Sequence, residues 1–195
     1  MAVPCPSCGR EYDVALFSFG RTIHCTCGTR VGVEPRVEHR PAQEPRFMVD
    51  AMLGRLARWL RVLGYDSAYQ ADIDDEHLVR RALDENRVIL TRDRALAEEW
   101  RVPSILVLRT EAPLEQLRQV AGRMRLDWRG RLFRRCSVCN APLTPAAPEQ
   151  VAGRVPARVL RELRRFVECR SCGRVYWEGS HTARMRSVLE ETLGE

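Results

Sequence analysis

Eight cysteines stand in close pairs, two pairs toward each end of the chain. The amino-terminal pairs are Cys5-Pro-Ser-Cys8 and Cys25-Thr-Cys27, and the carboxy-terminal pairs are Cys136-Ser-Val-Cys139 and Cys169-Arg-Ser-Cys172. Thiolates two or three residues apart can bind one tetrahedral Zn²⁺, but they are poorly placed for disulfides across a fold. We therefore expect two structural zinc sites, one in each terminal region, with no cysteine left over.

The two predicted zinc sites differ in regularity. The carboxy-terminal set has two CxxC motifs and would form a closed site with no open position for catalysis. In the amino-terminal set only Thr26 separates the second pair of thiols. His24 stands at the usual spacing from Cys27 and is therefore an alternative ligand. Four cysteines remain the preferred set, because thiolate is the softer ligand for zinc.

Aspartates follow or precede several predicted elements of the central segment. Asp50 comes directly after the apolar run 47–49, and Asp93 follows the run 88–90 after two residues. Asp75, with Asp74 as its rival, begins a predicted helix. In an open parallel sheet such positions meet outside the carboxyl ends of the strands. Carboxylates that converge without lysine partners favour a divalent cation such as Mg²⁺ or Mn²⁺.

Such a carboxylate-bound cation activates water and neutralises charge on a phosphodiester. The aspartates therefore indicate hydrolysis of a nucleic-acid strand. Taken singly, Asp74 or Asp75 can equally be a helix N-cap and Asp93 a turn former. Asp50 fits such a role less well, because a carboxylate next to a buried strand is costly without a partner.

The elements that must position these carboxylates alternate between strand and helix. Continuous apolar runs are typical of strands buried on both faces, and leucines at helical spacing followed by Gly64 indicate a helix that ends there. The pattern predicts an α/β fold with a parallel sheet. The expected strands are 47–49, 67–69, 88–90 and 104–108, and the expected helices are 53–63, 74–85, 94–100 and 113–124.

The chain carries a net charge of +6, and all 32 of its basic side chains are arginine. A GC-rich genome would also explain this bias, so position is more informative than content. A cluster of arginines lies around Trp128 and Phe133, in a pattern that suits a phosphate backbone and unstacked bases. Its members are Arg123, Arg125, Arg129, Arg131, Arg134 and Arg135.

Further arginines lie near the predicted carboxylate site. Arg55, Arg58 and Arg61 fall on the face of the first helix away from its leucines, and Arg92 adjoins Asp93. Arg55, Arg58 and Arg92 are candidates to bind the phosphates of the cleaved strand. For Arg61 we favour a solvated position with ordinary charge pairs.

The positions of the cysteine pairs and of a proline-rich segment predict the order of the domains. An amino-terminal zinc ribbon at 1–35 is followed by a proline-rich linker at 36–45, a nuclease-like domain at 46–128 and a carboxy-terminal ribbon at 129–195. Within the last ribbon, residues 157–167 are expected to form an amphipathic helix with a basic face. Trp177 and His181 are expected to close its thin core rather than to bind RNA.

These motifs together resemble the mutator-seven C-terminal RNase family, a PIN-like nuclease domain with a zinc ribbon attached. The resemblance covers about residues 46–185 and leaves the amino-terminal ribbon unexplained. It implies a Rossmann-like PIN fold with helices on both faces of the sheet, metal-dependent RNA cleavage, and acidic ligands at Asp50, Asp75 and Asp93. PIN-type sites often use a fourth acid, for which Glu111 is the candidate; Asp127 lies further away.

The sequence therefore favours a metal-dependent ribonuclease that cuts RNA endonucleolytically, with RNA as its partner. The leading alternative is a noncatalytic RNA-binding adaptor with a vestigial acidic cluster, and a protein-interaction scaffold is a second. The amino-terminal ribbon could also dock a protein or ribonucleoprotein partner. Closely spaced thiols, with neither a signal peptide nor an apolar membrane span, indicate the cytoplasm.

Overall fold

The computed structural model describes residues 1–33 and 44–194. The predicted linker at 36–45 lies almost wholly outside the described residues. Contacts divide the chain into two compact units, of which the first comprises 1–54 and 68–109 and the second comprises 55–67 and 110–195. Each unit thus contains segments from separate parts of the sequence. The predicted domain boundaries, which follow the sequence linearly, remain predictions.

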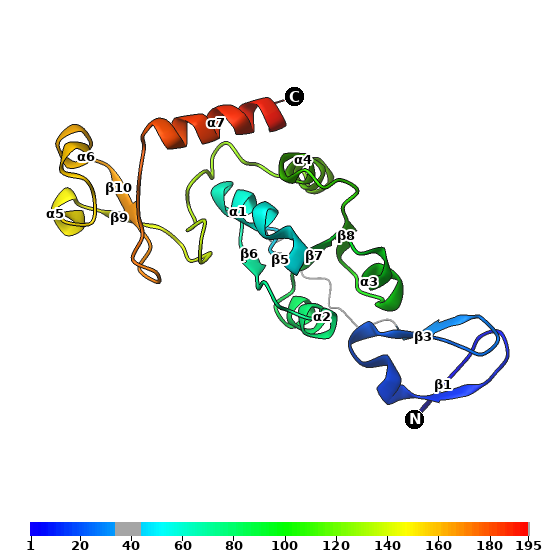
Figure 1. The fold of residues 1–195 in the computed structure, drawn as a ribbon. Helices are drawn as coiled ribbons and strands as arrows, with labels where there is room; N and C mark the ends of the chain where they lie inside the picture. Colours follow the sequence, from blue (N-terminus) through cyan, green and yellow to red (C-terminus); the bar gives the residue numbers. More distant parts are fainter. Residues whose placement is uncertain (34–43, 195) are drawn as a thin grey trace. The chain divides into compact units, whose positions relative to one another are not determined.

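A four-stranded parallel sheet forms the centre of the fold, and helices flank it (Figure 1). Its strand order is β6-β5-β7-β8. The register pairs Met48 of β5 with Ile89 of β7, and Leu90 of β7 with Leu106 of β8. The sequence prediction of a mixed α/β fold with a parallel sheet and a ribbon at each terminus is confirmed. The strands are β5 (Phe47–Val49), β6 (Ser67–Tyr69), β7 (Val88–Thr91) and β8 (Ile105–Val107).

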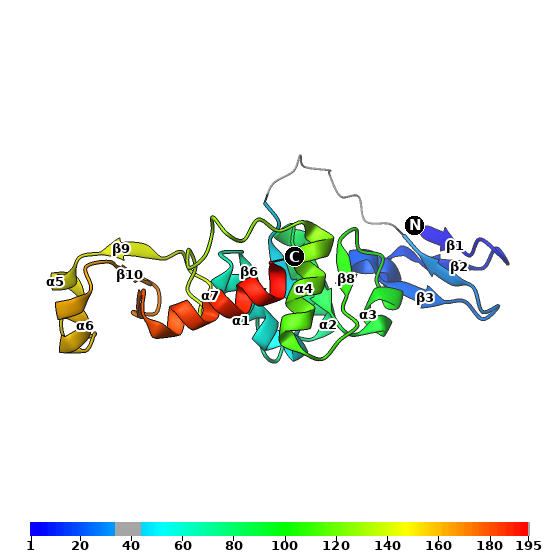
Figure 2. The same cartoon turned by 90° about the horizontal axis from the view of Figure 1, so that it is seen from above.

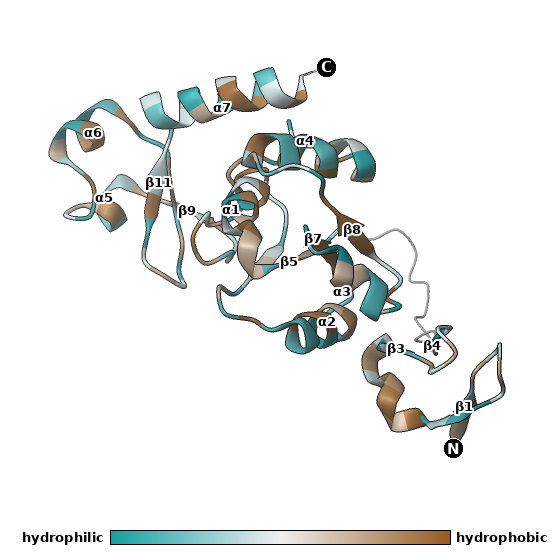
Figure 3. Ribbon diagram, turned by 45° about the vertical axis from the view of Figure 1, so that its right-hand side comes forward, coloured by the Kyte–Doolittle hydropathy of each residue, from teal (hydrophilic) through white to brown (hydrophobic). Residues whose placement is uncertain are grey.

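In the first unit, helices α2 (Asp75–Asp84) and α3 (Arg94–Glu99) pack against this sheet. Met48 and Ile89 from the strands meet Leu78 and Val79 from α2 in one buried cluster. All residues of β5 are buried, as its continuous apolar run predicts. Strand β8, brown in Figure 3, is only half-buried, because it lies at the edge of the sheet. The expectation that this run is buried on both faces was therefore wrong.

The amino-terminal ribbon belongs to the same unit. It consists of two short antiparallel hairpins joined by a 3-10 segment, and Cys5, Phe17, Cys25 and Val31 form its small core. Its elements are β1 (Ala2–Pro4), β2 (Glu11–Asp13), η1 (Val14–Gly20), β3 (Thr22–His24) and β4 (Arg30–Gly32).

The second unit combines helix α1 (Gly54–Val62), which follows the short turn η2 (Ala51–Leu53), with helix α4 (Pro113–Met124) and the carboxy-terminal region. Gly64 ends α1 at a φ of +90°, where a Cβ atom would clash with the backbone carbonyl of Arg131. Helix α7 (Ser180–Leu193), which the sequence analysis did not predict, packs against α4 (Figure 2). The Arg118 side chain of α4 donates to the backbone carbonyl of Thr192 at 2.9 Å.

The carboxy-terminal ribbon contains a three-stranded antiparallel sheet in the order β11-β10-β9. The helix expected at 157–167 is shorter, because Leu163 adopts extended backbone and Phe166 enters a strand. Trp177 packs on the ribbon core as expected, whereas His181 lies exposed on α7 and closes no core. The elements are β9 (Thr144–Ala146), α5 (Pro148–Val151), α6 (Ala157–Glu162), β10 (Phe166–Glu168) and β11 (Val175–Trp177).

Candidate active site and metal centres

Asp50 lies at the carboxyl end of β5 and is only 7 % exposed. Its backbone N–H donates to the carbonyl of Leu90 at 3.0 Å, which continues the pairing of β5 with β7. The hydroxyl of Thr91, a fully buried residue at the end of β7, donates to Asp50 Oδ2 at 2.5 Å. This hydrogen bond holds the Asp50 carboxylate in one orientation.

Asp93 stands two residues after Thr91 and caps helix α3. Its Oδ1 accepts from the backbone N–H of Ala95 at 2.7 Å, and its own N–H donates to the Thr91 hydroxyl oxygen at 2.9 Å. The Thr91 hydroxyl therefore links the segments that carry Asp50 and Asp93. The N-cap geometry and a role at an active site are compatible, because capping occupies only one oxygen of the Asp93 carboxylate.

The structure gives Asp74 and Asp75 different roles. Asp74 is the N-cap of α2, where its Oδ1 accepts from the backbone N–H of His77 at 2.9 Å, and this hydrogen bond lowers the pKa of Asp74. Asp75 is the first residue of α2. Desolvation raises the pKa of Asp75, and the negative charges of Asp50 and Asp93 raise it further. Asp75, rather than Asp74, thus experiences the field of the other two predicted acids.

Asp50, Asp75 and Asp93 each have at least one carboxylate oxygen that could bind a ligand. Within the described residues, Asp50 Oδ1, Asp93 Oδ2 and both Asp75 carboxylate oxygens accept no hydrogen bond. These oxygens do not meet as closely as metal ligands do, since the only groups within 4.8 Å in the described ranges are the two cysteine sets. Asp75 is exposed, so its side chain can change rotamer without loss of packing.

Two residues near this site were missed by the sequence analysis. The sequence analysis gave Thr91 no role, although the hydroxyl of a threonine at the end of a buried strand can orient a carboxylate on the neighbouring strand. Glu99, near the end of α3, adds to the negative field that raises the pKa of Asp75. Glu99 stands six residues after Asp93, which is not a spacing of helical neighbours, so no local pattern indicates it. Glu111, the predicted fourth acid, lies exposed before α4 in the second unit.

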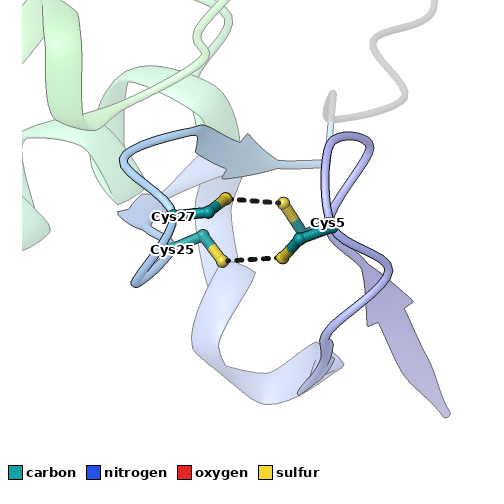
Figure 4. A group of neighbouring side chains, drawn as sticks. Cys5, Cys25 and Cys27 are labelled. Carbon is teal, nitrogen blue, oxygen red and sulfur yellow. Dashed lines mark hydrogen bonds between the residues drawn. The ribbon is translucent and has the colours of Figure 1, made fainter.

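The amino-terminal thiols form one group. Cys5 Sγ lies 3.7 Å from Cys27 Sγ, and Cys8 Sγ lies 3.4 Å from Cys25 Sγ (Figure 4). Four sulfurs around a tetrahedral Zn²⁺, at about 2.3 Å from the ion, are about 3.8 Å apart. The described metal-binding group contains these four cysteines and not His24. The set therefore fits Zn²⁺.

Two tight turns bring these thiols together. In the first turn, the Gly9 N–H donates to the carbonyl of Cys5, four residues before it. In the second turn, the Gly28 N–H donates to the carbonyl of Cys25, only three residues before it. The second turn is therefore shorter by one residue, which accommodates the Cys25-Thr-Cys27 spacing. Both glycines have positive φ, at +74° and +85°. A hydrogen bond from the backbone N–H of Cys27 is the largest cause that lowers the pKa of Cys25, to about 5. The second turn therefore favours the thiolate form of Cys25, which is the form that zinc requires.

The carboxy-terminal thiols form a second group of four. Cys136 Sγ lies 3.6 Å from Cys172 Sγ, and Cys139 Sγ lies 3.3 Å from Cys169 Sγ. Burial alone would raise the pKa of Cys136, but backbone N–H groups of the turn and the Tyr176 hydroxyl, 3.0 Å away, lower it to about 6. All eight cysteines are free thiols, so both groups can hold structural zinc ions.

The arginine cluster divides between structural and exposed members. Arg135 donates to the carbonyl of Asn140 at 2.8 Å and forms an ion pair with Asp66 at 3.4 Å. The Arg131 guanidinium lies over the ring of Tyr65, at 5.2 Å from its centroid. Arg134 is exposed and donates to the carbonyl of Gly130 at 2.7 Å. The first two thus stabilise the second unit whether or not they also bind RNA.

Arg61 is buried, at 5 % exposure, and the expectation of a solvated position was wrong. Its guanidinium donates to the carbonyl of Ser67 at 2.9 Å and to the carbonyl of Val138, inside the first carboxy-terminal zinc turn, at 2.7 Å. This pairing with carbonyls explains how a charged side chain is buried at acceptable cost. Arg61 therefore connects α1 to the zinc turn within the second unit.

Three further arginines, Arg55, Arg58 and Arg92, were predicted to contact the substrate. Arg55 and Arg58 are exposed on α1 in the second unit. Arg92 is half-buried in the first unit, next to Asp93. Their contact with substrate remains a prediction. Among the described residues no helix is both long and apolar enough to cross a membrane.

Most of the chain matches a known protein family. The family described as "Mut7-C RNAse domain" matches residues 45–189, which is most of the chain. The matched segment contains the central sheet, the three aspartates and the carboxy-terminal cysteine group, and it excludes the amino-terminal ribbon. Comparison with curated proteins and with solved structures found no match.

Proposed function

Because the chain belongs to the Mut7-C RNAse domain family, we propose that it is a metal-dependent ribonuclease that cuts RNA endonucleolytically. The observation that carries this proposal is the influence of Asp50 and Asp93 on Asp75. The charges of Asp50 and Asp93 act on Asp75, and each carboxylate keeps an oxygen without a hydrogen bond in the described part of the chain. A carboxylate whose charged form is disfavoured by neighbouring negative charges is stabilised by a bound cation.

Asp50, Asp75 and Asp93 would hold the Mg²⁺ or Mn²⁺ ion. Carboxylate oxygens are the ligands that these hard cations prefer. When bound, the cation lowers the pKa of water and offsets the negative charge of the phosphodiester. Thr91 keeps Asp50 fixed, whereas the exposed Asp75 moves its side chain toward the other two acids to complete the set.

The reaction we propose is hydrolysis. The oxygen of a water molecule bonds to the phosphorus atom, and the bond between phosphorus and the leaving ribose oxygen breaks. Asp75 is the carboxylate best suited to accept the proton of the attacking water, because its pKa is raised. A proton from solvent completes the leaving hydroxyl group.

Other parts of the chain would serve binding. Exposed arginines, among them Arg55, Arg58 and Arg134, would contact phosphates of the RNA, while the two zinc ions would stabilise the ribbons rather than take part in cleavage. The amino-terminal ribbon could in addition dock a protein partner. Free thiols in both sets agree with a reducing compartment, and we propose the cytoplasm.

Circular single-stranded RNA tests this function directly. The purified protein is expected to linearise the circle when Mg²⁺ or Mn²⁺ is added and to leave it intact without added divalent cation. Asp75→Asn should reduce the rate at least about 100-fold, since it removes a ligand and proton acceptor. Asp72→Asn, an exposed neighbour outside the site, is the matched control. RNA binding without cleavage under either metal would support the adaptor instead.

A further inference from the structure

The amino-terminal ribbon and the helices of the nuclease sheet together line a pocket of about 580 Å³. The ribbon contributes one wall through η1 and β3, and α2 and α3 contribute the other through Glu76, Glu99 and Trp100. Both walls belong to the first unit, and the ribbon lies beside α3 in Figure 1. The volume lies in the range of small-ligand sites, so one nucleotide fits. The main ribbon residues of the lining are Leu16, Phe19, Arg21, Thr22 and His24.

Specific hydrogen bonds hold the two walls together. The buried Thr22 hydroxyl donates to the carbonyls of Glu98 and Glu99, at 3.0 and 2.8 Å, and Arg101 N–H donates to the carbonyl of Gly20 at 2.6 Å. The last carbonyls of a helix have no partner within it, so Thr22 satisfies groups that α3 leaves open. The pocket is therefore a fixed part of the unit and not a gap between tethered modules.

The pocket offers flat surfaces for stacking. The Arg21 guanidinium lies over the Trp100 ring, at 5.8 Å from its centroid, and Arg21 is exposed and lines the pocket. Phe19 adopts a φ of +56°, which is unusual for a bulky residue, and Arg80 lies over its ring at 5.3 Å. Trp100 Nε1 is buried and has no hydrogen-bond partner in the described ranges.

The pocket is also acidic beside the predicted catalytic residues. Glu76 directly follows Asp75, and the charge of Glu99 is felt at Asp75. A phosphate would be repelled by this wall. An amino group on a nucleobase would instead donate to a carboxylate, as cytosine N4 does to acidic side chains. Arginine and aromatic planes are the surfaces on which proteins stack unpaired RNA bases.

We propose that this pocket binds one unpaired nucleobase of the RNA strand that is cut, stacked on Arg21 and hydrogen-bonded through its exocyclic amino group to Glu76 or Glu99. The inference rests on the proposed ribonuclease function and adds a specificity site to it. Adenine, cytosine and guanine carry such a group, and uracil does not. The amino-terminal ribbon thus becomes part of substrate selection.

A binding experiment tests the pocket without cleavage. Single-stranded RNAs with 2-aminopurine at successive positions are titrated with the full chain carrying Asp93→Asn, in Ca²⁺ buffer with zinc retained. At one position, stacking should quench the fluorescence. Adding Arg21→Ala should remove that quenching and weaken binding roughly tenfold. Arg10→Ala, an exposed ribbon arginine outside the pocket, should change neither. Unchanged quenching with Arg21→Ala would overturn the proposal.

A cleavage experiment separates this inference from the function itself. RNAs that differ only at the quenched position are cut by the unmodified chain, and cleavage should be several-fold faster with adenine, cytosine or guanine than with uracil or an abasic site. Glu76→Gln should narrow this difference, measured as the ratio of the cleavage rate with cytosine to the cleavage rate with uracil. Metal-dependent cleavage that is indifferent to this base would contradict the pocket and preserve the nuclease. Absence of cleavage would contradict the proposed ribonuclease function. The fluorescence experiment would then still show whether the pocket binds a base.

Discussion

The Thr91 hydroxyl donates to Asp50 Oδ2 at 2.5 Å, and both residues are buried at the carboxyl ends of adjacent parallel strands. The same hydroxyl oxygen accepts from the backbone N–H of Asp93. One side chain thus fixes the direction of one predicted metal ligand and the approach of the segment that bears another. In metal sites such supporting hydrogen bonds often matter nearly as much as the ligands.

Replacing Thr91 with valine should impair the site without removing a carboxylate. Thr91→Val keeps the volume but leaves Asp50 and the Asp93 N–H without a buried partner, which should cost about 1–3 kcal/mol of stability. Cleavage should fall by about 10–100-fold, as for other residues that orient metal ligands. Urea unfolding and cleavage rates measure both effects. Thr91→Ser, which retains the hydroxyl, should recover most of the activity; equal loss in both variants would contradict this role.

Asp75 should destabilise the chain when no cation is bound. Its pKa is raised in the fold, so its contribution to stability is present below the pKa of the unfolded chain and is lost as pH rises through the folded pKa. At pH 7, Asp75→Asn should therefore raise the Tm measured without Mg²⁺. The same variant should lose the further rise in Tm that Mg²⁺ gives the unmodified chain. Asp74→Ala removes an N-cap instead and should lower the Tm in both conditions.

Glu85 should contribute stability whose pH dependence is opposite to that of Asp75. Burial would raise its pKa, but hydrogen bonds from Arg81 at 2.7 Å and Arg87 at 2.5 Å outweigh burial and lower the pKa. Its stabilising effect is present above the unfolded pKa of about 4.3 and is lost as pH falls through the folded value. Glu85→Gln should cost about 1–3 kcal/mol at pH 7.

Urea unfolding at pH 7 and at pH 3.5 measures this Glu85 contribution. The unmodified chain and Glu85→Gln both lose zinc at the lower pH, so the informative quantity is the difference between their free energies of unfolding. This difference should shrink on acidification. Asp84→Asn is the matched control, because its 4.0 Å contact with Arg80 is exposed on the same helix. A constant difference at both pH values would contradict the assignment.

Arg61 should stabilise the carboxy-terminal zinc site from a distance in sequence. Arg61→Met leaves the carbonyls of Ser67 and Val138 without their donor and should cost about 2–4 kcal/mol. It should also speed the release of one of two zinc equivalents to a chromogenic chelator. Arg58→Met, exposed on the same helix, should leave release unchanged. Release at the unmodified rate from Arg61→Met would show that this contact does not support the zinc turn.

Local pattern was sufficient to predict the elements that carry the site. The apolar run 47–49 and the helix Pro113–Met124 appear as predicted, because continuous burial and a proline at the first helical turn are strong local signals. The cysteine spacing likewise predicted two four-thiol groups. These features depend on a few adjacent residues, which is why sequence alone reveals them.

Features that depend on distant contacts were not predictable in this way. Arg61 looks solvated by helical periodicity, and only the zinc turn around Val138, far along the chain, supplies the acceptors that bury it. Leu163 and Phe166 match a helical pattern, yet sheet pairing of Phe166 with Ala146 and Trp177 ends the helix early. The ribbon pocket similarly requires Thr22 to meet the end of α3.

The most direct test of the proposed function compares Asp50→Asn and Asp93→Asn with the unmodified chain, in parallel assays of RNA cleavage and RNA binding in Mg²⁺. Asp84→Asn serves as the surface control, and thermal unfolding verifies that each variant is folded. Each site variant should cut at least about 100-fold more slowly while its Kd for RNA changes less than about threefold, since the ligands act on the cation rather than on affinity. Undiminished cleavage in either variant would contradict the carboxylate site.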